Sequence, residues 1–163
     1  MKQDPQHAFG AGEPVPRLGE IGLYNFAPYL MNRIMGRYNA SLREEMAEFG
    51  LSTPKMRALA VLSVIDGIQI SQLSVYAVVE QSTLSRALDQ LMAEGLIRRQ
   101  PDPNDSRVTR IVITDAGRAA FERIWPSMAR MYRRMFAGIA DDERAAFVAT
   151  LQKMLRNIRK HEF

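Results

Sequence analysis

Hydrophobic residues recur every three or four positions over most of the chain, which is the period of an amphipathic helix. The first such run begins at Leu23 and stops before Gly50. Pro28 is compatible with the first turn of a helix, so the regular helix is expected to begin between Asn25 and Pro28. The pattern therefore predicts one long N-terminal helix within residues 20–52.

Three shorter helical runs follow, and each is bounded by residues that commonly cap helices. Thr53, followed by a proline, is predicted to be the N-cap of a helix that ends at Asp66, and Ser71 to be the N-cap of a short helix. A further helix is expected over Ser82–Glu94, with Gly95 as its C-terminal stop. These runs predict three helices that follow one another along the chain with short connections.

The period changes after these helices. Residues 96–99 and 108–113 are short and rich in branched side chains, and the turn-forming sequence DPNDS separates them at residues 102–106. Branched runs on either side of a tight turn are typical of a β-hairpin. Thr114 is then expected to cap a fifth helix, which Pro126 should bend.

The last helix is predicted to start near Asp141 and to present one apolar face. At the other end of the chain, prolines and glycines before residue 20 are unfavourable for a helix and predict a flexible arm. The expected organisation is an arm at 1–19, an N-terminal helix at 20–52, a compact module at 53–114 and C-terminal helices at 115–163.

Composition adds weaker constraints. With 163 residues, 47% hydrophobic and 25% charged, the chain fits either one globular domain or a compact module with helices that pack it against a partner. No apolar run is long enough to cross a membrane. A net charge of +4 permits nucleic acid as a partner without requiring it. The chain has no cysteine, which excludes disulfides and thiolate metal sites, and no secretory signal is visible, so the cytoplasm is expected.

Helix, short helix, turn, helix and hairpin is the element order of a winged helix-turn-helix, whose second helix enters the major groove of DNA. If Leu84, Leu88 and Leu91 face the core, the polar residues of the first two turns of that helix face outward. The alternative is that Ser82 and Thr83 only cap the helix and that Arg86 pairs with Asp89 or Asp102 in solvent.

The hairpin favours the DNA-binding interpretation, because several arginines lie close to its turn, where a hairpin tip would reach the minor groove. Asp105 lies two residues before Arg107 and is expected to hold that side chain in one rotamer. The predicted DNA-binding residues are Ser71, Gln81, Ser82, Thr83, Ser85, Arg86, Asp105, Arg107 and Arg110.

Two sequence blocks carry a resemblance to a known family. STLSRALDQLMAEGLIRR at residues 82–99, and DPNDSR followed by VTRIVIT at residues 102–114, resemble the recognition helix and wing of the multiple antibiotic resistance regulator (MarR) family. The resemblance extends over residues 23–160. It implies that Arg107 is the wing arginine, Asp105 its orienting acid and Arg86 the recognition-helix arginine, and Gly117 stands where the family often has glycine.

The resemblance also implies a homodimer and a small aromatic or phenolic effector. The first, fifth and sixth helices would form the dimer interface, although such faces usually make an intramolecular core. Residues that would line an effector pocket, or else serve as plain packing residues, are Tyr24, Tyr29, Met31, Arg33, Met35 and Trp125.

Other function classes have less support. His7 and His161 lie in terminal segments and no Ser, His and acid grouping or phosphate loop is visible, so no catalytic site, metal site or cofactor is predicted. The main alternative is a helical interaction protein that keeps a winged-helix scaffold without DNA function. The sequence thus predicts a mainly α fold with a small β-hairpin wing, and a regulator that binds double-stranded DNA.

Overall fold

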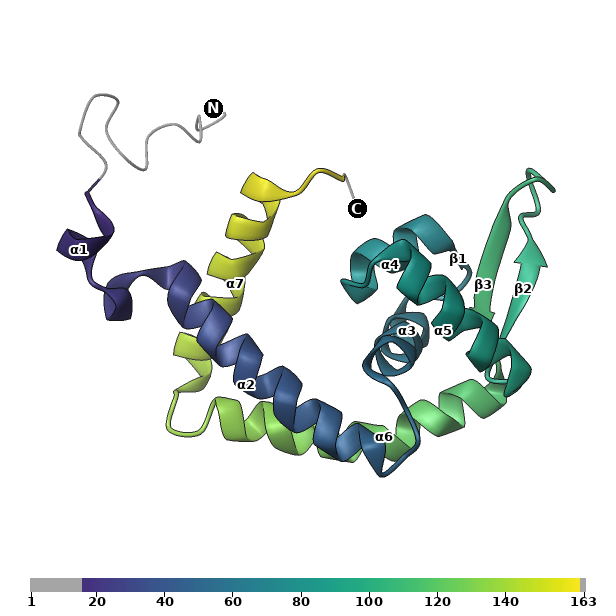
Figure 1. Cartoon of the computed structure of the whole chain (residues 1–163), viewed down its shortest axis with the longest axis horizontal. Helices are drawn as coiled ribbons and strands as arrows, with labels where there is room; N and C mark the ends of the chain where they lie inside the picture. The colour runs from purple at the N-terminus through teal and green to yellow at the C-terminus, as the bar shows by residue number, and fades with distance from the viewer. Residues whose placement is uncertain (1–15, 162–163) are drawn as a thin grey trace. The chain divides into compact units, whose positions relative to one another are not determined.

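The computed structural model describes residues 16–161, whose elements are drawn in Figure 1. In chain order they are α1 (Leu18–Ile21), the short 3₁₀ helix η2 (Leu23–Asn25), α2 (Ala27–Ala47), α3 (Thr53–Val64), β1 (Ile68–Gln69), α4 (Ile70–Ala77), α5 (Gln81–Ala93), β2 (Ile97–Pro101), β3 (Thr109–Ile113), α6 (Asp115–Met135) and α7 (Asp141–Ile158). The mainly helical fold with a β-hairpin wing is confirmed.

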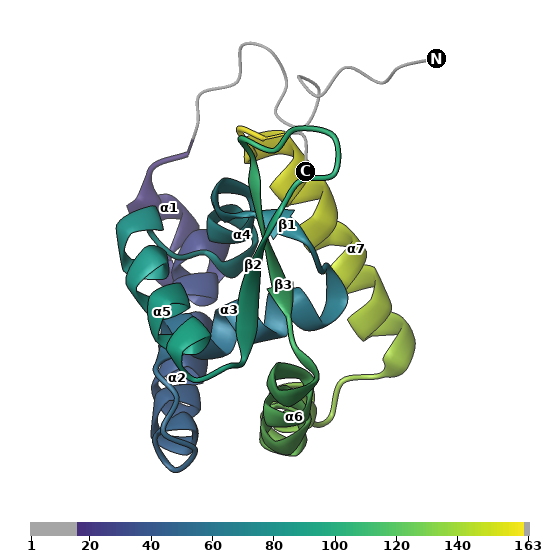
Figure 2. The ribbon, with the colours of Figure 1, turned by 90° about the vertical axis from the view of Figure 1, so that its right-hand side faces the viewer.

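Residues 39–135 form one compact unit, and the segments before and after it form a second unit. The core of the 39–135 unit lies between α3, α4, α5 and an antiparallel sheet with strand order β1-β3-β2. Ile111 of β3 is opposite Ile68 of β1, Ile113 is opposite Ile97 of β2, and all four side chains are buried. Figure 2 shows the 39–135 unit from the side of the hairpin, where β2 and β3 lie beside α5.

Leucines from the three helices complete this core. Their side chains are fully buried, and burial of each contributes roughly 1.5–3 kcal/mol: they are Leu59, Leu62, Leu73, Leu84, Leu88 and Leu91. The spacing of the last three matches the inward face that the sequence predicts for the recognition helix. One side of α5 is thereby fixed against the core, and its opposite side is left to the surface.

The sequence placed the starts of three helices one or two residues too late. Ser52 is the N-cap of α3 and Gln69 that of α4, in place of Thr53 and Ser71, and Glu80 caps α5, which begins at Gln81 instead of Ser82. Glutamine and glutamate are uncommon caps, so the serines that follow them favoured the later starts of α4 and α5. Gln69 nevertheless forms a capping box with Gln72, whose Oε1 accepts from the Gln69 N–H at 3.2 Å.

Other boundaries agree with the sequence. Helix α2 begins at Ala27, inside the predicted interval, and ends three residues before Gly50, which has a φ of +66°. Helix α6 follows Thr114, whose Oγ1 accepts from the Gly117 N–H at 3.1 Å, and it continues through Pro126 as one helix. Helix α7 begins at Asp141, as predicted.

The N-terminal segment differs from the prediction of an unstructured arm up to residue 19. Helix α1 already begins at Leu18, and the Arg17 backbone N–H donates to Glu20 Oε2 at 2.8 Å. That bond to a carboxylate stabilises a short turn despite the preceding prolines. Residues 18–19 of the predicted flexible arm therefore lie in a helical turn, and its first fifteen positions lie outside the described residues.

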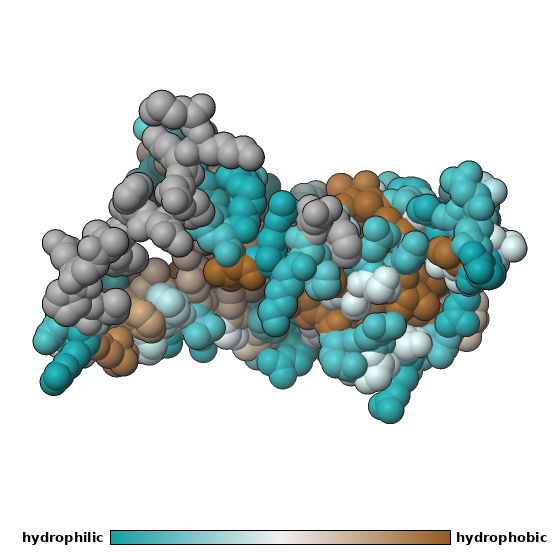
Figure 3. Space-filling view, turned by 90° about the horizontal axis from the view of Figure 1, so that it is seen from above, coloured by the Kyte–Doolittle hydropathy of each residue, from teal (hydrophilic) through white to brown (hydrophobic). Residues whose placement is uncertain are grey.

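The second unit exposes many apolar side chains. Helix α7 has no buried residue, and its outward apolar residues include Phe147, Leu155 and Ile158, which are 44%, 61% and 77% exposed. Tyr24, in η2, is 80% exposed. In Figure 3 hydrophobic areas interrupt the hydrophilic surface of both units on the face seen from above, most extensively over the 39–135 unit. Apolar exposure on this scale is typical of an interaction surface.

Candidate nucleic-acid interface

Helix α5 presents a polar face opposite its buried leucines. Gln81, Ser82, Thr83 and Arg86 are exposed and Ser85 is half-buried. These residues lie in the first two turns, the part of a recognition helix that meets base edges and phosphates. Small hydroxyl side chains in these turns permit close approach, and one arginine supplies the positive charge.

Arg86 has no hydrogen-bond or ion-pair partner among the described residues. The two carboxylates proposed as alternative partners are occupied, because Asp89 pairs with Arg99 at 2.8 Å and Asp102 pairs with Arg110. The alternative in which Arg86 closes a local ion pair is therefore wrong. Its guanidinium is available to an external acceptor.

Glu80 occupies the N-terminal end of α5, a role that the sequence reading missed. Its carboxylate accepts from the Ser82 hydroxyl and from the backbone N–H groups of Ser82 at 2.9 Å and Thr83 at 3.0 Å. The Ser82 hydroxyl, then these two N–H groups, lower the pKa of Glu80 from 4.5 to about 2. An acid directly before a helix is the signal that would have identified this cap.

The lowered pKa of Glu80 predicts acid sensitivity. Because the folded pKa lies below the unfolded one, ionised Glu80 stabilises the fold above about pH 4.5, and this contribution is lost as the pH falls toward 2. Urea unfolding at pH 7, 4 and 3 should show a difference between the parent and Glu80→Gln that shrinks with acid. Ser82→Ala should reduce that pH dependence. A difference in unfolding free energy between the parent and Glu80→Gln that stays constant with pH would contradict the lowered pKa of Glu80.

The wing between β2 and β3 carries Arg107 at its exposed end, with 88% of the side chain accessible. Its Nε donates to Asp105 Oδ1 at 3.0 Å and its Nη2 to Asp105 Oδ2 at 2.9 Å. This two-point contact, together with the Arg107 backbone N–H, holds the pKa of Asp105 below its usual range and raises that of Arg107. Asp105 thus orients Arg107, as the sequence predicts, and leaves most of it in solvent.

Arg110 is placed differently from the other predicted contact residues. Its Nε donates to Asp102 and its Nη1 donates to the Gly67 carbonyl at 2.6 Å, so the guanidinium joins the residue after β2 to the residue before β1. Asp102 is buried, and the backbone N–H of Asn104, followed by Arg110, lowers its pKa. Arg110 therefore acts as a brace for the wing, and its predicted DNA contact stays a prediction.

Side chains of α3 fix both helices of the helix-turn-helix. The nearly buried Lys55 pairs with Glu94 at the C-terminal end of α5, at 2.5 Å. Arg57 donates to the Val78 carbonyl at 3.0 Å and to Asn39 Oδ1 of α2 at 3.1 Å. Val78 has a φ of +51°, which is unusual for a β-branched residue, and Arg57 supports this turn before α5.

Ser71, another predicted contact residue, is the second residue of α4 and is exposed. Its carbonyl accepts from the Ser74 hydroxyl at 2.7 Å. The structure thus places an exposed hydroxyl at the start of α4, the helix that crosses the DNA backbone in a helix-turn-helix. This position is compatible with the predicted DNA contact of Ser71, which stays a prediction.

Comparison with known proteins decides the family. The sequence model of the MarR family matches residues 51–109. A MarR-family transcriptional regulator from Silicibacter pomeroyi of known structure is 61% identical, with 91% of this chain and 100% of that chain covered and a TM-score of 0.86. The chain belongs to the MarR family.

Two further proteins extend the comparison. The transcriptional repressor IacR of Pseudomonas putida is 29% identical over 140 residues, 86% of this chain and 81% of the relative. BpsR of Bordetella bronchiseptica, at 23% identity, shares the fold with a TM-score of 0.69 over 82% of this chain and 95% of that chain. The predicted family, fold and role as a DNA-binding transcriptional regulator are therefore confirmed.

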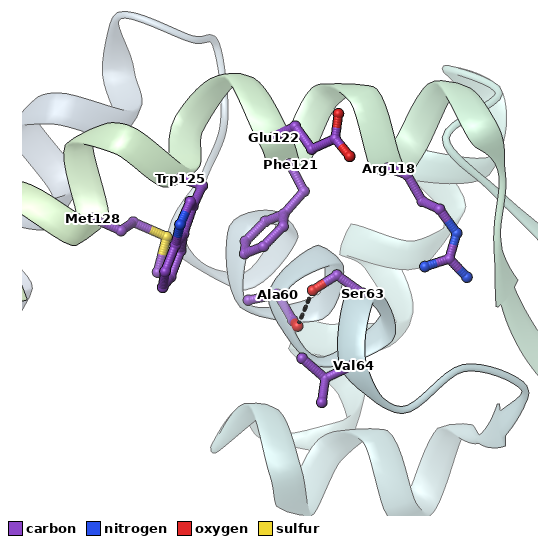
Figure 4. Close-up of a pocket in the computed structure, with 8 residues that line it drawn as sticks. All are labelled: Ala60, Ser63, Val64, Arg118, Phe121, Glu122, Trp125 and Met128. Carbon is purple, nitrogen blue, oxygen red and sulfur yellow. Dashed lines mark hydrogen bonds between the residues drawn. The ribbon is translucent and has the colours of Figure 1, made fainter.

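The predicted effector-pocket residues of this MarR-family chain lie in both units. In one unit, Arg33 Nη1 donates to the Tyr29 hydroxyl at 3.0 Å, and the rings of Tyr24 and Tyr29 meet edge to face at 6.4 Å. Met31 is half-buried and Met35 is exposed on the same helix. In the 39–135 unit, Trp125 lines a cavity of about 480 Å³ between α3 and α6, which the other five residues do not line (Figure 4). A pocket made of all six remains a prediction.

Two features are absent from residues 16–161, the part of the chain that the structure describes. No group of three or more potential metal-ligating side chains is found in this part of the MarR-family chain. Within the same range, no helix has the length and hydropathy needed to cross a membrane. His7, one of the two histidines weighed as a catalytic candidate, lies outside the described residues.

Proposed function

We propose that this MarR-family regulator is a repressor that binds a palindromic operator as a homodimer. The observation that carries the proposal is the geometry of Arg107, an arginine at the tip of the wing that is 88% exposed yet held at two points by Asp105. Such an arrangement lowers the rotamer entropy lost on binding and leaves the positive charge accessible. The repressor role is supported by the name of the relative IacR.

In this proposal α5 lies in the major groove and the wing in the adjacent minor groove. Ser82, Thr83, Ser85 and Arg86 face base edges and phosphates, while Gln81 and Ser71 approach the backbone. Glu80 places a negative charge beside these contacts, so the positive charge needed for binding comes from Arg86 and from the wing. Two copies related by a two-fold axis would read two half-sites one helical turn apart.

DNA binding should depend steeply on salt, because each phosphate contact releases counterions. A duplex selected from random sequences is titrated at 50 and 200 mM salt with the parent and with Arg86→Ala. Arg86 has no partner to hold its side chain, so its loss should cost about 1 kcal/mol and leave the fold intact. A chain that bound no duplex at either salt concentration would instead support the helical interaction protein.

Dimerisation is supported by the apolar surface of the second unit. Helix α7 buries none of its residues within the chain, although it carries a continuous apolar face that includes Phe147, Leu151, Leu155 and Ile158. Exposure of such a face to water is unfavourable by roughly 25 cal/mol per Å². A second copy of the chain would cover it and align the two recognition helices.

Sedimentation should therefore give twice the 18.5 kDa mass of the chain. Leu155→Glu places a charge on the apolar face of α7 and should produce a monomer that binds the operator weakly. Lys153→Gln, on the opposite face of the same helix, changes the net charge by the same amount and should remain dimeric. A Leu155→Glu variant that stayed dimeric would remove α7 from the interface.

We further propose that a small aromatic effector controls DNA binding. The DNA binding of BpsR is regulated by 6-hydroxynicotinic acid, which is a small aromatic compound. In the present chain Trp125 lines a cavity of suitable volume beside the DNA-binding module. Loss of operator affinity on addition of 6-hydroxynicotinate or a related compound tests this proposal.

A further inference from the structure

The turn between α4 and α5 contains an unusual backbone conformation. Val78 has φ and ψ both at +51°, in the left-handed region, which is unfavourable for residues with a side chain and most unfavourable for β-branched ones. Among the described residues, every other position with a positive φ is a glycine. A strained residue thus lies shortly before the helix that carries the proposed DNA contacts, where strain is often linked to function.

The left-handed residue is required by the way α4 ends. The Val78 N–H donates to the Val75 carbonyl at 3.2 Å, and the Val79 N–H donates to the Ser74 carbonyl at 3.1 Å. These two bonds form a Schellman motif, in which the left-handed position is usually occupied by glycine. Val79 then packs against the core and Glu80 caps α5. The conformation of Val78 therefore sets the direction in which the chain enters α5.

The side chain of Val78 does not compensate for this conformation, because it is 78% exposed and gains little from packing. Support for the turn comes instead from α3, which lies beside α4 and α5 (Figure 1). Arg57 Nη1 donates to the Val78 carbonyl at 3.0 Å and to the Ala77 carbonyl at 3.4 Å. Both carbonyls belong to the end of α4, where partners within the helix are missing.

Arg57 is itself held in place by α2. Its Nη2 donates to Asn39 Oδ1 at 3.1 Å, and both residues are half-buried. The planar guanidinium thereby reaches two backbone carbonyls and one side-chain amide oxygen at the same time, which a lysine ammonium would not do with the same geometry. Arg57 therefore joins α2 and α3 to the turn before α5.

The two ends of α5 are positioned by different contacts. The pair of Lys55 and Glu94, at 2.5 Å, fixes the C-terminal end of the helix. The N-terminal end follows directly from the turn at Val78, and the residues proposed to meet DNA, from Gln81 to Arg86, lie at this end. A change of φ at Val78 would therefore displace the proposed DNA contacts while the C-terminal end of α5 stays anchored.

We propose that Arg57 is a positioning residue for DNA binding, which holds Val78 in the left-handed conformation so that the first turns of α5 fit the major groove. The inference rests on the proposed function of α5 in reading DNA, and it adds a residue that acts without touching the DNA. The two residues are coupled, since Arg57 is needed only because position 78 is not a glycine.

This coupling predicts that one substitution repairs the effect of another. Arg57→Ala removes the support of the turn, so affinity for a duplex selected from random sequences should fall about 10-fold. Val78→Gly removes the need for that support, because glycine adopts a positive φ freely. The double variant Arg57→Ala with Val78→Gly should therefore bind within about 2-fold of Val78→Gly alone.

Val78→Ala is the matched control. Alanine also removes the exposed branched side chain but keeps a Cβ atom, so the left-handed conformation remains unfavourable. Combined with Arg57→Ala, it should leave most of the loss of DNA affinity in place. Rescue by glycine and not by alanine would assign the effect to the backbone at position 78.

Salt dependence separates positioning from a direct DNA contact. If Arg57 bound a phosphate, Arg57→Ala would reduce the slope of log affinity against log salt by about 1. The guanidinium is directed to three acceptors within the chain, so the loss of affinity should be the same at low and at physiological salt.

The turn can also be followed without DNA, by hydrogen exchange of the Val79 amide, which donates to Ser74. Its protection, relative to that of Leu88 in the middle of α5, should fall about 10-fold in Arg57→Ala and return when Val78→Gly is added. Thermal unfolding confirms that the variants are folded. If Arg57→Ala does not fold, Asn39→Ala removes only the anchor of the guanidinium and should give a smaller loss of DNA affinity that Val78→Gly again reverses.

The possible outcomes are distinct. An Arg57→Ala chain that binds the duplex like the parent overturns the positioning role. A double variant as weak as Arg57→Ala, or equal rescue by Val78→Ala, overturns the coupling to the backbone of the turn. A parent chain that binds no duplex contradicts the proposed function instead, and hydrogen exchange of the Val79 amide then still decides whether Arg57 holds the turn.

Discussion

Gly117→Ala is expected to lower the free energy of unfolding by about 3 kcal/mol or more, the upper part of the range for overpacking. A Cβ atom at this position would lie 2.1 Å from the Leu96 carbonyl oxygen and 2.8 Å from Ile113 Cγ1. The nearer atom belongs to the backbone, so no rotamer change relieves the overlap. Helix α6 would have to move away from the start of the wing.

Such a movement is opposed by the contacts of Thr114. Its backbone N–H donates to the Leu96 carbonyl at 3.0 Å and its hydroxyl to the Gly95 carbonyl at 2.7 Å. These bonds hold the first turn of α6 against the segment that joins α5 to β2. The glycine noted from the family resemblance is therefore required by a close approach of two backbones.

Helix propensity alone predicts that Gly117→Ala would raise the free energy of unfolding, so the experiment distinguishes the two effects by their sign. Alanine is favoured over glycine inside a helix by about 1 kcal/mol, so without the contact Gly117→Ala would stabilise α6. Ala119→Gly, at an exposed position two residues along the helix, measures that propensity alone and should destabilise by about 1 kcal/mol. Urea unfolding of both variants gives the comparison, and a Gly117→Ala chain as stable as the parent would exclude the steric argument.

The sequence predicted the helices and the hairpin well because their signals are local. The leucine spacing of α5 and the proline after Thr53 each lie within a few residues of what they determine. Strand β1 was missed, since two residues are too few for an alternating pattern and its pairing with β3 joins positions far apart in the chain. The caps were misplaced for a related reason, because several polar residues compete at each helix start.

Among the functional residues, too, contacts between near neighbours in the sequence were predicted and contacts between distant positions were not. Asp105 and Arg107 are two positions apart, so their pairing was visible in the sequence and the structure places them in contact. Arg118, the partner of Asp66, and Glu94, the partner of Lys55, lie 52 and 39 positions away, and no local pattern relates them. The cavity of Trp125 depends equally on how α6 packs against α3, which explains why only one of its lining residues was anticipated.

Arg107→Ala is expected to weaken operator binding by about 2 kcal/mol, or roughly 30-fold. The effect should exceed that of Arg86→Ala because Asp105 already holds the Arg107 guanidinium, whereas the Arg86 side chain must be ordered on binding. A cation in the minor groove prefers the narrow, more negative groove of A·T-rich DNA. Replacing A·T pairs beside the half-sites by G·C should therefore weaken the parent more than the variant.

Two further substitutions separate charge from orientation. Arg107→Lys keeps the charge but loses the two-point contact with Asp105, and Asp105→Ala keeps the arginine but frees its rotamers, so both should show smaller losses than Arg107→Ala. If Arg107 instead only closes the turn, each of these changes would shift stability slightly and leave DNA affinity unaltered. Operator affinity at low and physiological salt, measured together with the thermal midpoint of unfolding, distinguishes a DNA-reading role of Arg107 from a role in the turn alone. An Arg107→Ala chain that binds like the parent at both salt concentrations would leave the wing without a reading role, because no other wing arginine combines that exposure with an orienting carboxylate in the described chain.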